Sequence, residues 1–169
     1  KGGAFLCFSP AFCIVSIMDI LFTLRHFITS GHRNGHGVHS PNMYDFFTKV
    51  LYNSEKFDYS AAELSLVRLR TSNQKIMATS AGAKGNGEQH ERAVSDIAHQ
   101  SSSYGKYGRL LQRMSAFLKP KGILELGTSL GIGTLYLASG SPESNVITVE
   151  ACPETSKVAA DNFRLLGLD

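Results

Sequence analysis

A chain of 169 residues, 43% hydrophobic and 18% charged, has the length and composition of one ordinary globular domain. Its formal net charge of +3 is too small to indicate nucleic-acid binding, and no run of Lys or Arg exceeds two residues. The cysteines Cys7, Cys13 and Cys152 form no Cys-x-x-Cys pair, so we expect reduced thiols and a cytoplasmic protein.

Residues 1–24 form a strongly apolar N-terminal segment. A membrane-spanning helix needs about 20 apolar residues, and here Pro10 and Asp19 interrupt the run, so a membrane segment is disfavoured. Two alternatives stay open. Met18 is the natural start and the residues before it come from upstream sequence, or the segment is an amphipathic helix that packs on the domain.

Residues 25–90 are predicted to be a helical N-terminal region. Ser40 precedes a proline, which is the pattern of an N-cap and the first helical position. Residues 60–63 have the sequence of a capping box that starts a second helix. Residues 72–89 are rich in Ser, Gly, Ala and Asn, so they are predicted to form a loop.

Four histidines, His26, His32, His36 and His39, lie in or near a glycine-rich stretch. Metal ligation needs converging ligands, and no acid or cysteine lies close by in the sequence. We therefore expect a flexible loop without a metal, and the alternative is a lid or substrate contact over an active site.

Residues 91–169 are predicted to form the first half of an α/β domain. Helical patterning resumes near Ala93, and apolar residues then recur at three- and four-residue steps. The pattern predicts, in order, a helix at 104–118, a strand at 123–126, a helix at about 131–139, a strand at 146–150 and a helix from Pro153 to Gly167.

The most informative stretch joins the first of these strands to its helix. Glu125 is followed by a turn that contains Gly127 and Gly131, which permit positive φ and the close approach of a ligand. The next helix begins with free N–H groups and a positive dipole end. Glu150 ends the second strand, where a carboxylate can accept hydrogen bonds from a ribose diol. This order predicts a nucleotide-type cofactor site.

The spacing excludes two related sites. A phosphate-binding P-loop needs a Lys at the end of its glycine turn, and none follows Gly127 in the turn. A dinucleotide fingerprint that starts at Gly131 would place Tyr136 at its third glycine, and we expect this side chain to block the close approach of helix and strand. A ligand without a pyrophosphate therefore fits better.

These residues resemble the class I S-adenosylmethionine-dependent methyltransferases. The run from Glu125 to Gly127, with Gly131 after three more residues, is similar to their first motif, and Glu150 is similar to the acid that holds the ribose hydroxyls. Residues 152–154 and 159–162 are similar to the O-methyltransferase-like branch, and residues 35–41 and 94–108 to uncharacterised bacterial members.

The resemblance implies a Rossmann-like fold, S-adenosylmethionine as cofactor, and cofactor contacts from Glu125, Gly127, Thr128, Ser129, Gly131, Glu150 and Ala151. Thr128 and Ser129 would act through hydroxyl or backbone, or are simple turn formers. Glu125 has a structural ion pair as its alternative role, and Ala151 would contact adenine. The residues indicate no metal ligand and no catalytic residue.

The expected function is methyl transfer to an oxygen or nitrogen of a small-molecule acceptor. Only two strands are visible before Asp169, so we expect an N-terminal part of a Rossmann-like enzyme, truncated after the second strand, with its base further along. One alternative is a non-catalytic cofactor-binding or interaction remnant of that fold. Another is a Rossmann-type oxidoreductase, which Tyr136 disfavours. The acceptor, the metal dependence and the oligomeric state are not indicated.

Overall fold

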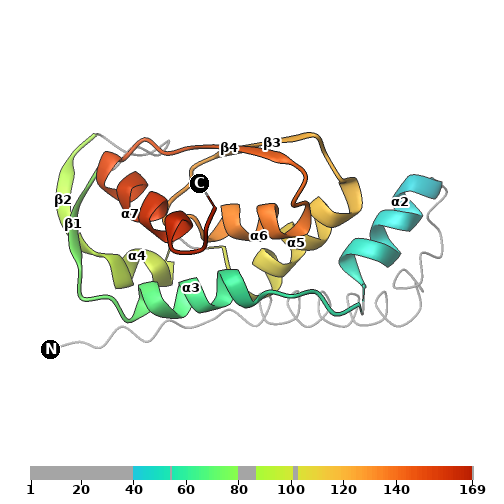
Figure 1. Ribbon diagram of the computed structural model, residues 1–169, viewed down its shortest axis with the longest axis horizontal. Coiled ribbons are helices and arrows are strands. Elements are labelled where there is room, and N and C mark those ends of the chain that lie inside the picture. The colour runs from blue at the N-terminus through green and yellow to red at the C-terminus, as the bar shows by residue number, and fades with distance from the viewer. Residues whose placement is uncertain (1–39, 54, 80–86, 101–102, 169) are drawn as a thin grey trace, which may run out of the picture. The chain divides into compact units, whose positions relative to one another are not determined.

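The computed structural model describes residues 40–53, 55–79, 87–100 and 103–168 (Figure 1). The chain falls into two compact units, residues 1–53 and residues 54–169. The predictions about the apolar segment 1–24, about Met18 and about four histidines lie outside the described residues; these histidines are His26, His32, His36 and His39.

The described part of the first unit is one helical stretch. Helix α2, Pro41–Phe46, continues as a π-helical segment η2, Phe47–Leu51, in which Val50 is buried. Ser40 has the extended backbone of an N-cap, and the proline after it occupies the first turn, so the predicted helix start is confirmed.

The second unit is mixed α/β and contains two small sheets. Its elements are α3 Ser60–Arg70, β1 Lys75–Thr79, β2 Gln89–Ala93, α4 Val94–Gln100, α5 Gly105–Leu118, β3 Gly122–Leu126, α6 Ile132–Gly140, β4 Asn145–Val149 and α7 Pro153–Arg164. Strands β1 and β2 are antiparallel. Strands β3 and β4 are parallel, with Gly122 opposite Asn145 and Leu126 opposite Val149. The helices and strands predicted beyond residue 104 are confirmed.

Strand β1 corrects one prediction. Residues 72–89 were expected to form a loop, yet Lys75–Thr79 pairs along its whole length with β2. Ile76 and Ala78 are buried while Met77 between them is exposed, which is the two-residue period of a strand. The strand has only five residues and lies in a Ser- and Gly-rich stretch. Its two-residue period was therefore a weaker signal for a strand than the composition was for a loop.

The start of α3 also differs from the expected capping box. The backbone N–H of Ser60 donates to Oδ1 of Asp58 at 2.9 Å, and Tyr59 is the N-cap residue. The Glu63 side chain instead accepts two hydrogen bonds at Oε1 from Arg109 on α5. The carboxylate that caps α3 therefore comes from two residues before the serine.

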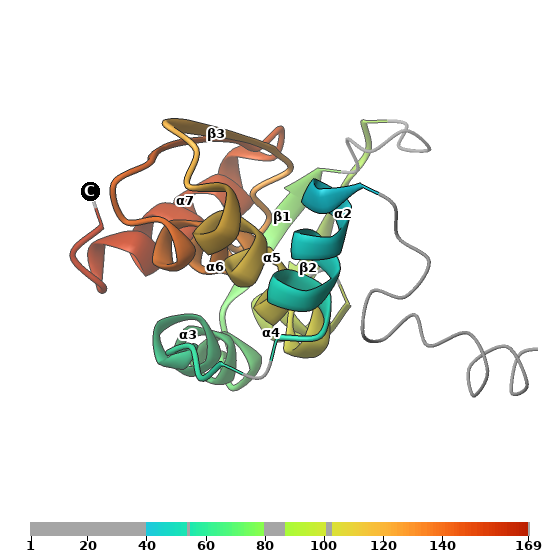
Figure 2. The same cartoon turned by 90° about the vertical axis from the view of Figure 1, so that its right-hand side faces the viewer.

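The helices of this unit lie in layers beside the β3–β4 sheet. The sheet lies on one side of α5 and α6, and α3 lies on the other side (Figures 1 and 2). The core of the unit joins α3, β1, α4, α6, α7 and the turn before α6, and its bulky buried side chains include Leu66, Leu69, Val94, Leu130, Ile132, Leu135, Tyr136 and Val158. Burying these side chains supplies the main stabilisation of the unit.

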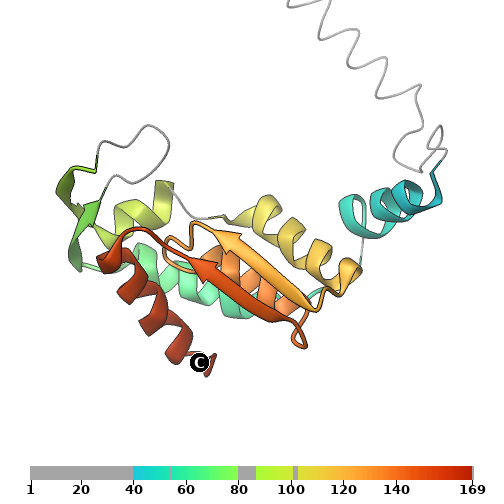
Figure 3. The same cartoon turned by 90° about the horizontal axis from the view of Figure 1, so that it is seen from above.

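The face of the β3–β4 sheet that points away from α5 and α6 is apolar. No described residue covers it. Figure 3 looks onto this face. Its side chains are Leu124, Leu126, Ile147 and Val149, with 67%, 78%, 57% and 52% of their surface exposed. Both faces of parallel sheets are normally buried, so a face that the described residues leave uncovered is unusual.

Helices α5 and α6 approach each other closely through glycines. A Cβ at Gly108 would lie 2.2 Å from a ring carbon of Tyr136, and a Cβ at Gly140 would lie 2.2 Å from the carbonyl oxygen of Gln112. Tyr136 is fully buried against α5 and Tyr59. The prediction that Tyr136 blocks the approach of helix and strand is therefore wrong, because the ring packs against α5.

We expect Gly108→Ala to destabilise the unit. Alanine normally improves a helix by about 1 kcal/mol, but overpacking against a fully buried ring costs about 1–3 kcal/mol. Urea denaturation should therefore give a lower free energy of unfolding. Gly122→Ala is the control, because its Cβ would meet only the Asn145 carbonyl at 3.7 Å. A gain in stability close to the full helix benefit of about 1 kcal/mol would contradict this packing.

Candidate functional site

The predicted site residues come together where β3 and β4 end. The two strands are parallel, so the turn that follows β3 and the acid that follows β4 lie at the same edge. The backbone N–H groups of Gly127 and Thr128 both donate to the carbonyl oxygen of Val149, at 2.8 and 3.2 Å. These bonds continue the sheet ladder into the turn and fix the turn against the end of β4.

The turn depends on three residues with positive φ. Gly127, Ser129 and Gly131 have φ values of 96°, 50° and 84°. Gly131 also packs closely on α7, because a Cβ there would lie 2.6 Å from the ring of Phe163 and the ring would have to shift. Ser129 adopts a left-handed conformation that a residue with a Cβ adopts at a cost of about 1–2 kcal/mol, and its N–H has an unusually good acceptor.

That acceptor is the carboxylate of Glu150. Its Oε2 accepts from the N–H of Ser129 at 2.7 Å, and its Oε1 accepts from the N–H of Cys152 at 2.9 Å. A carboxylate has about four acceptor positions, so each oxygen keeps capacity for another donor. The half-buried Glu150 thus lies fixed beside the turn, and the exposed Ala151 follows it.

Glu125 makes its contacts on the inner side of the sheet. Its Oε2 accepts hydrogen bonds from the hydroxyls of Thr134 on α6 and Thr148 on β4. The hydroxyls of Thr128 and Thr148 lie 2.6 Å apart, so Thr128 joins the same group. The expected alternative, an ion pair, is absent from the described residues, where hydroxyls take the place of a cation.

The charged side chains in the sequence around the site are all acidic. The sequence has no Lys, Arg or His between residues 122 and 156, and it has four glutamates there: Glu125, Glu143, Glu150 and Glu154. The amides of Gly127, Thr128, Ser129 and Gly131 all donate to acceptors within the protein. A phosphate needs cations or free amides. These residues therefore suit a ligand that brings its own donors or a positive charge.

Sequence reasoning missed a buried amide behind the turn. Asn162 on α7 is fully buried, donates to the carbonyl of Leu130 at 3.3 Å, and accepts from the guanidinium of Arg68. It therefore links α3 and α7 to the turn. The sequence singles out residues 159–162 only through the family resemblance, and neither that nor a polar residue on the inner face of a helix identifies a partner.

Cys152, which begins α7, was likewise not expected to have a role. Its thiol is buried, and the backbone N–H of Thr79 on β1 donates to Sγ at 3.3 Å. Burial raises the pKa of this thiol, but hydrogen bonds from Thr155 and Thr79 outweigh burial and leave the pKa below its usual value. The contact attaches the β1–β2 hairpin to the segment that carries Glu150.

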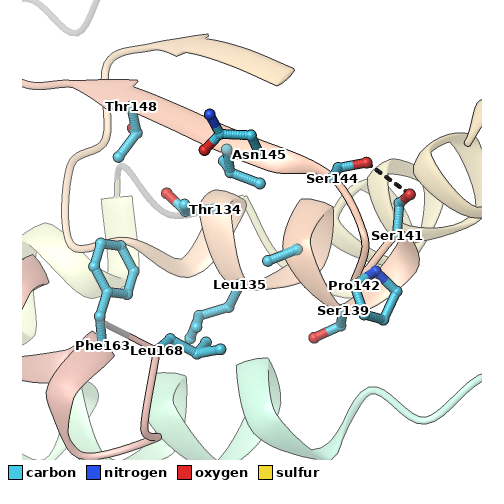
Figure 4. Close-up of a pocket in the computed structure, with 12 residues that line it drawn as sticks. Thr134, Leu135, Ser139, Ser141, Pro142, Ser144, Asn145, Thr148, Phe163 and Leu168 are labelled. Atoms are coloured by element: carbon cyan, nitrogen blue, oxygen red, sulfur yellow. Dashed lines mark hydrogen bonds between the residues drawn. The ribbon is translucent and has the colours of Figure 1, made fainter. Parts of the chain in front are cut away.

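A cavity of about 560 Å³ lies beside the site, among α6, β4 and the end of α7 (Figure 4). Its lining is largely apolar and includes Leu135, Phe163 and Leu168. Thr134 of α6 and Thr148 of β4 also line it. No predicted cofactor-binding residue lines it. The cavity therefore borders the threonines around Glu125 and is separate from the turn.

No metal centre is apparent within the part of the chain that the structure describes, where no three His, Cys, Asp or Glu side chains converge. The four N-terminal histidines precede the described residues. The prediction that the chain has no metal site stays a prediction.

No protein-family model matches this chain. Over 63 residues it is 40% identical to the transmembrane O-methyltransferases of Propithecus coquereli, Macaca mulatta and Homo sapiens. This stretch covers 37% of the chain and 21–23% of the length of these relatives, so the chain matches less than a quarter of each. The similarity supports a methyltransferase.

The relatives also correct the expected location. They are named transmembrane proteins, which is at odds with a cytoplasmic assignment, and that assignment is withdrawn. Among the helices that the structure describes, none is long and apolar enough to cross a membrane. The apolar residues 1–24 lie outside the described residues.

Two glycine substitutions in the turn should separate strain from steric overlap. Gly127→Ala meets nothing within 4 Å, so we expect it to cost about 1–2 kcal/mol of stability through its positive φ alone. Gly131→Ala adds overlap with Phe163, for about a further 1–3 kcal/mol. Denaturant titration measures both. If Gly131→Ala cost no more than Gly127→Ala, the packing of α7 on the turn would be refuted.

Proposed function

We propose that this chain carries the cofactor-binding part of an S-adenosylmethionine-dependent methyltransferase. The partial similarity to O-methyltransferases supports the transfer of a methyl group. The proposal adds three points to this support. The cofactor is S-adenosylmethionine, the β3–α6–β4 unit is part of a Rossmann-like fold, and the acceptor is a small molecule with an oxygen or nitrogen nucleophile.

The observation that carries the proposal is the placement of Glu150. Its carboxylate is held by the amides of Ser129 and Cys152, at the carboxyl end of β4 and beside the glycine turn. A carboxylate fixed in this way accepts hydrogen bonds from the two hydroxyls of a ribose without having to be ordered first. Residues at this place in an α/β sheet typically bind the ribose of a nucleotide-type cofactor.

The polarity of the site supports this cofactor over a dinucleotide. S-adenosylmethionine has no phosphate, so it does not need the amides of Gly127, Thr128, Ser129 and Gly131, which already donate to protein acceptors. When bound, it supplies a methyl group on a positively charged sulfonium. The carboxylates of Glu125 and Glu150 make the surroundings of the turn negative, which favours a cation.

The remaining residues have roles that follow from their positions. Gly127 is exposed, with nothing within 4 Å of the space a Cβ would fill, so a ligand can approach its backbone. We assign Gly131 and Ser129 to shaping the turn, and the exposed Ala151 to contact with the adenine. The protein would hold and orient the cofactor, and the group that deprotonates the acceptor is not assigned to a residue.

We expect Glu150→Ala to weaken the binding of S-adenosylhomocysteine at least tenfold, which is about 1.4 kcal/mol. The substitution removes the acceptor for the ribose and releases the Ser129 amide. Isothermal titration calorimetry on the whole chain measures the dissociation constant. Glu143→Ala is the matched control, because it removes the same charge from the exposed turn between α6 and β4.

A parallel titration with NAD tests the competing oxidoreductase. Binding of S-adenosylhomocysteine but not NAD supports the proposal. Binding of NAD alone refutes it. Equal affinities of the wild type and Glu150→Ala for S-adenosylhomocysteine would refute the ribose assignment, even if the cofactor binds.

A further inference from the structure

Four side chains behind the glycine turn form a chain of hydrogen bonds with a defined direction. The single hydroxyl hydrogen of Thr148 is donated to Glu125, at 2.7 Å from Oε2. Thr148 therefore has no hydrogen left for Thr128, whose hydroxyl oxygen lies 2.6 Å away, and Thr128 must be the donor of that pair. Thr134 donates to the same Oε2 from α6.

The direction of these bonds decides what each group can offer to a ligand. Thr128 and Thr134 are buried, with 6% and 7% of their surface exposed, and both hydroxyl hydrogens point inward. Thr128 then contributes only its backbone to the ligand side of the turn. Glu125 receives two hydroxyl donors on one oxygen, and the other oxygen lies against Gly133, where a Cβ would be 2.7 Å from Oε1.

We propose that Thr128, Thr134 and Thr148, which converge on the carboxylate of Glu125, are positioning residues that hold the glycine turn in its cofactor-binding shape. Glu125 then serves as the shared acceptor of this threonine cluster and not as a ligand of the cofactor. The proposal rests on the proposed function, since it names how that site is kept in shape.

The position of the cluster in the fold explains why it would control the turn. Thr128 is in the turn, Thr134 is in the first turn of α6, and Glu125 and Thr148 lie opposite each other in the paired strands. Figure 4 shows the side chains of Thr148 and Thr134 pointing into the space between β4 and α6. One carboxylate therefore connects both strands, the helix and the turn.

Burial makes this connection sensitive to the loss of a single hydroxyl. A half-buried carboxylate that loses a donor keeps its charge with poorer solvation, and hydrogen bonds to charged groups contribute more than neutral ones. Loss of the Thr148 hydroxyl also leaves Thr128 without its acceptor. The turn would then be held at this side by its backbone hydrogen bonds alone.

The first test does not need a ligand. Hydrogen exchange of the amides in residues 127–131 is compared in the wild type, Thr148→Val and Thr148→Ser. The measurement is made without denaturant, at a pH where exchange occurs through local opening of the structure. The valine has the shape of threonine without its hydroxyl, and the serine restores the hydroxyl. We expect exchange about tenfold faster in Thr148→Val, which is the effect of one lost bond of this type, and protection close to wild type in Thr148→Ser.

Thr71→Val is the matched control, because it removes an exposed hydroxyl at the end of α3, far along the chain from the turn. Thermal melting of every variant separates local loosening from a general loss of stability. Unchanged exchange in the turn of Thr148→Val, or faster exchange that Thr148→Ser does not restore, would overturn the proposal.

The second test distinguishes positioning from direct contact. Glu125→Gln keeps a carbonyl oxygen that accepts the two hydroxyls, whereas a ligand role that needs the charge would be lost. We expect the dissociation constant of S-adenosylhomocysteine to rise at least tenfold in Thr148→Val but no more than about threefold in Glu125→Gln, since only the first removes a hydrogen bond of the cluster. The opposite order would make Glu125 a ligand and overturn the proposal.

The two tests keep this proposal separate from the proposed function. If the wild type binds no S-adenosylhomocysteine, the proposed function fails, while hydrogen exchange still decides whether the threonine cluster holds the turn. If the wild type binds and Thr148→Val loosens the turn without weakening binding, the proposed function stands and the positioning role is refuted.

Discussion

The carbonyl oxygen of Val149 holds the candidate site together. It accepts from two consecutive amides of the glycine turn, Gly127 and Thr128, and so extends the parallel pairing of β3 and β4 past the end of the strands. With the turn fixed there, the left-handed Ser129 directs its N–H at Glu150. The direction of α6, the placement of Glu150 and the inward position of the Thr128 hydroxyl all depend on this junction.

Local features of the site were predictable from sequence because they depend on nearby residues. The positive φ of Gly127 and Gly131, the strands on either side and the acid at the end of β4 follow from residue type and spacing. The threonine cluster was not predictable, since it joins residues 9 to 23 positions apart through side chains that look like ordinary strand and helix positions. Strand β1 was not predicted because it lies in a stretch with the composition of a loop. The direction of the Tyr136 ring was not predicted either, because it depends on the space left by Gly108, and an apolar periodicity does not show which helix a glycine faces.

The two faces of β3 explain why a carboxylate can lie inside the fold. Residues alternate along a strand, and here Glu125 is on the face that covers α6 while Leu124 and Leu126 are on the open face. An isolated charge between sheet and helix would be strongly unfavourable, but two hydroxyl donors compensate it, and Gly133 leaves the space it needs. Glu125 on the inner face therefore needs these particular neighbours. Leu124 and Leu126 on the outer face are residue types that are common in parallel strands.

The internal hydrogen bonds also limit what the site can bind. The amides of Gly127, Thr128, Ser129 and Gly131 and the threonine hydroxyls donate to protein acceptors, and the strongest acceptor near Gly127 is the carboxylate of Glu150. A ligand rich in phosphate oxygens would meet these acceptors and no Lys, Arg or His from residues 122–156. A ligand with a ribose diol, an amine and a sulfonium brings donors and positive charge to the same place. The selection of such a ligand would come from the Glu150 carboxylate and from the four turn amides that already donate to protein acceptors.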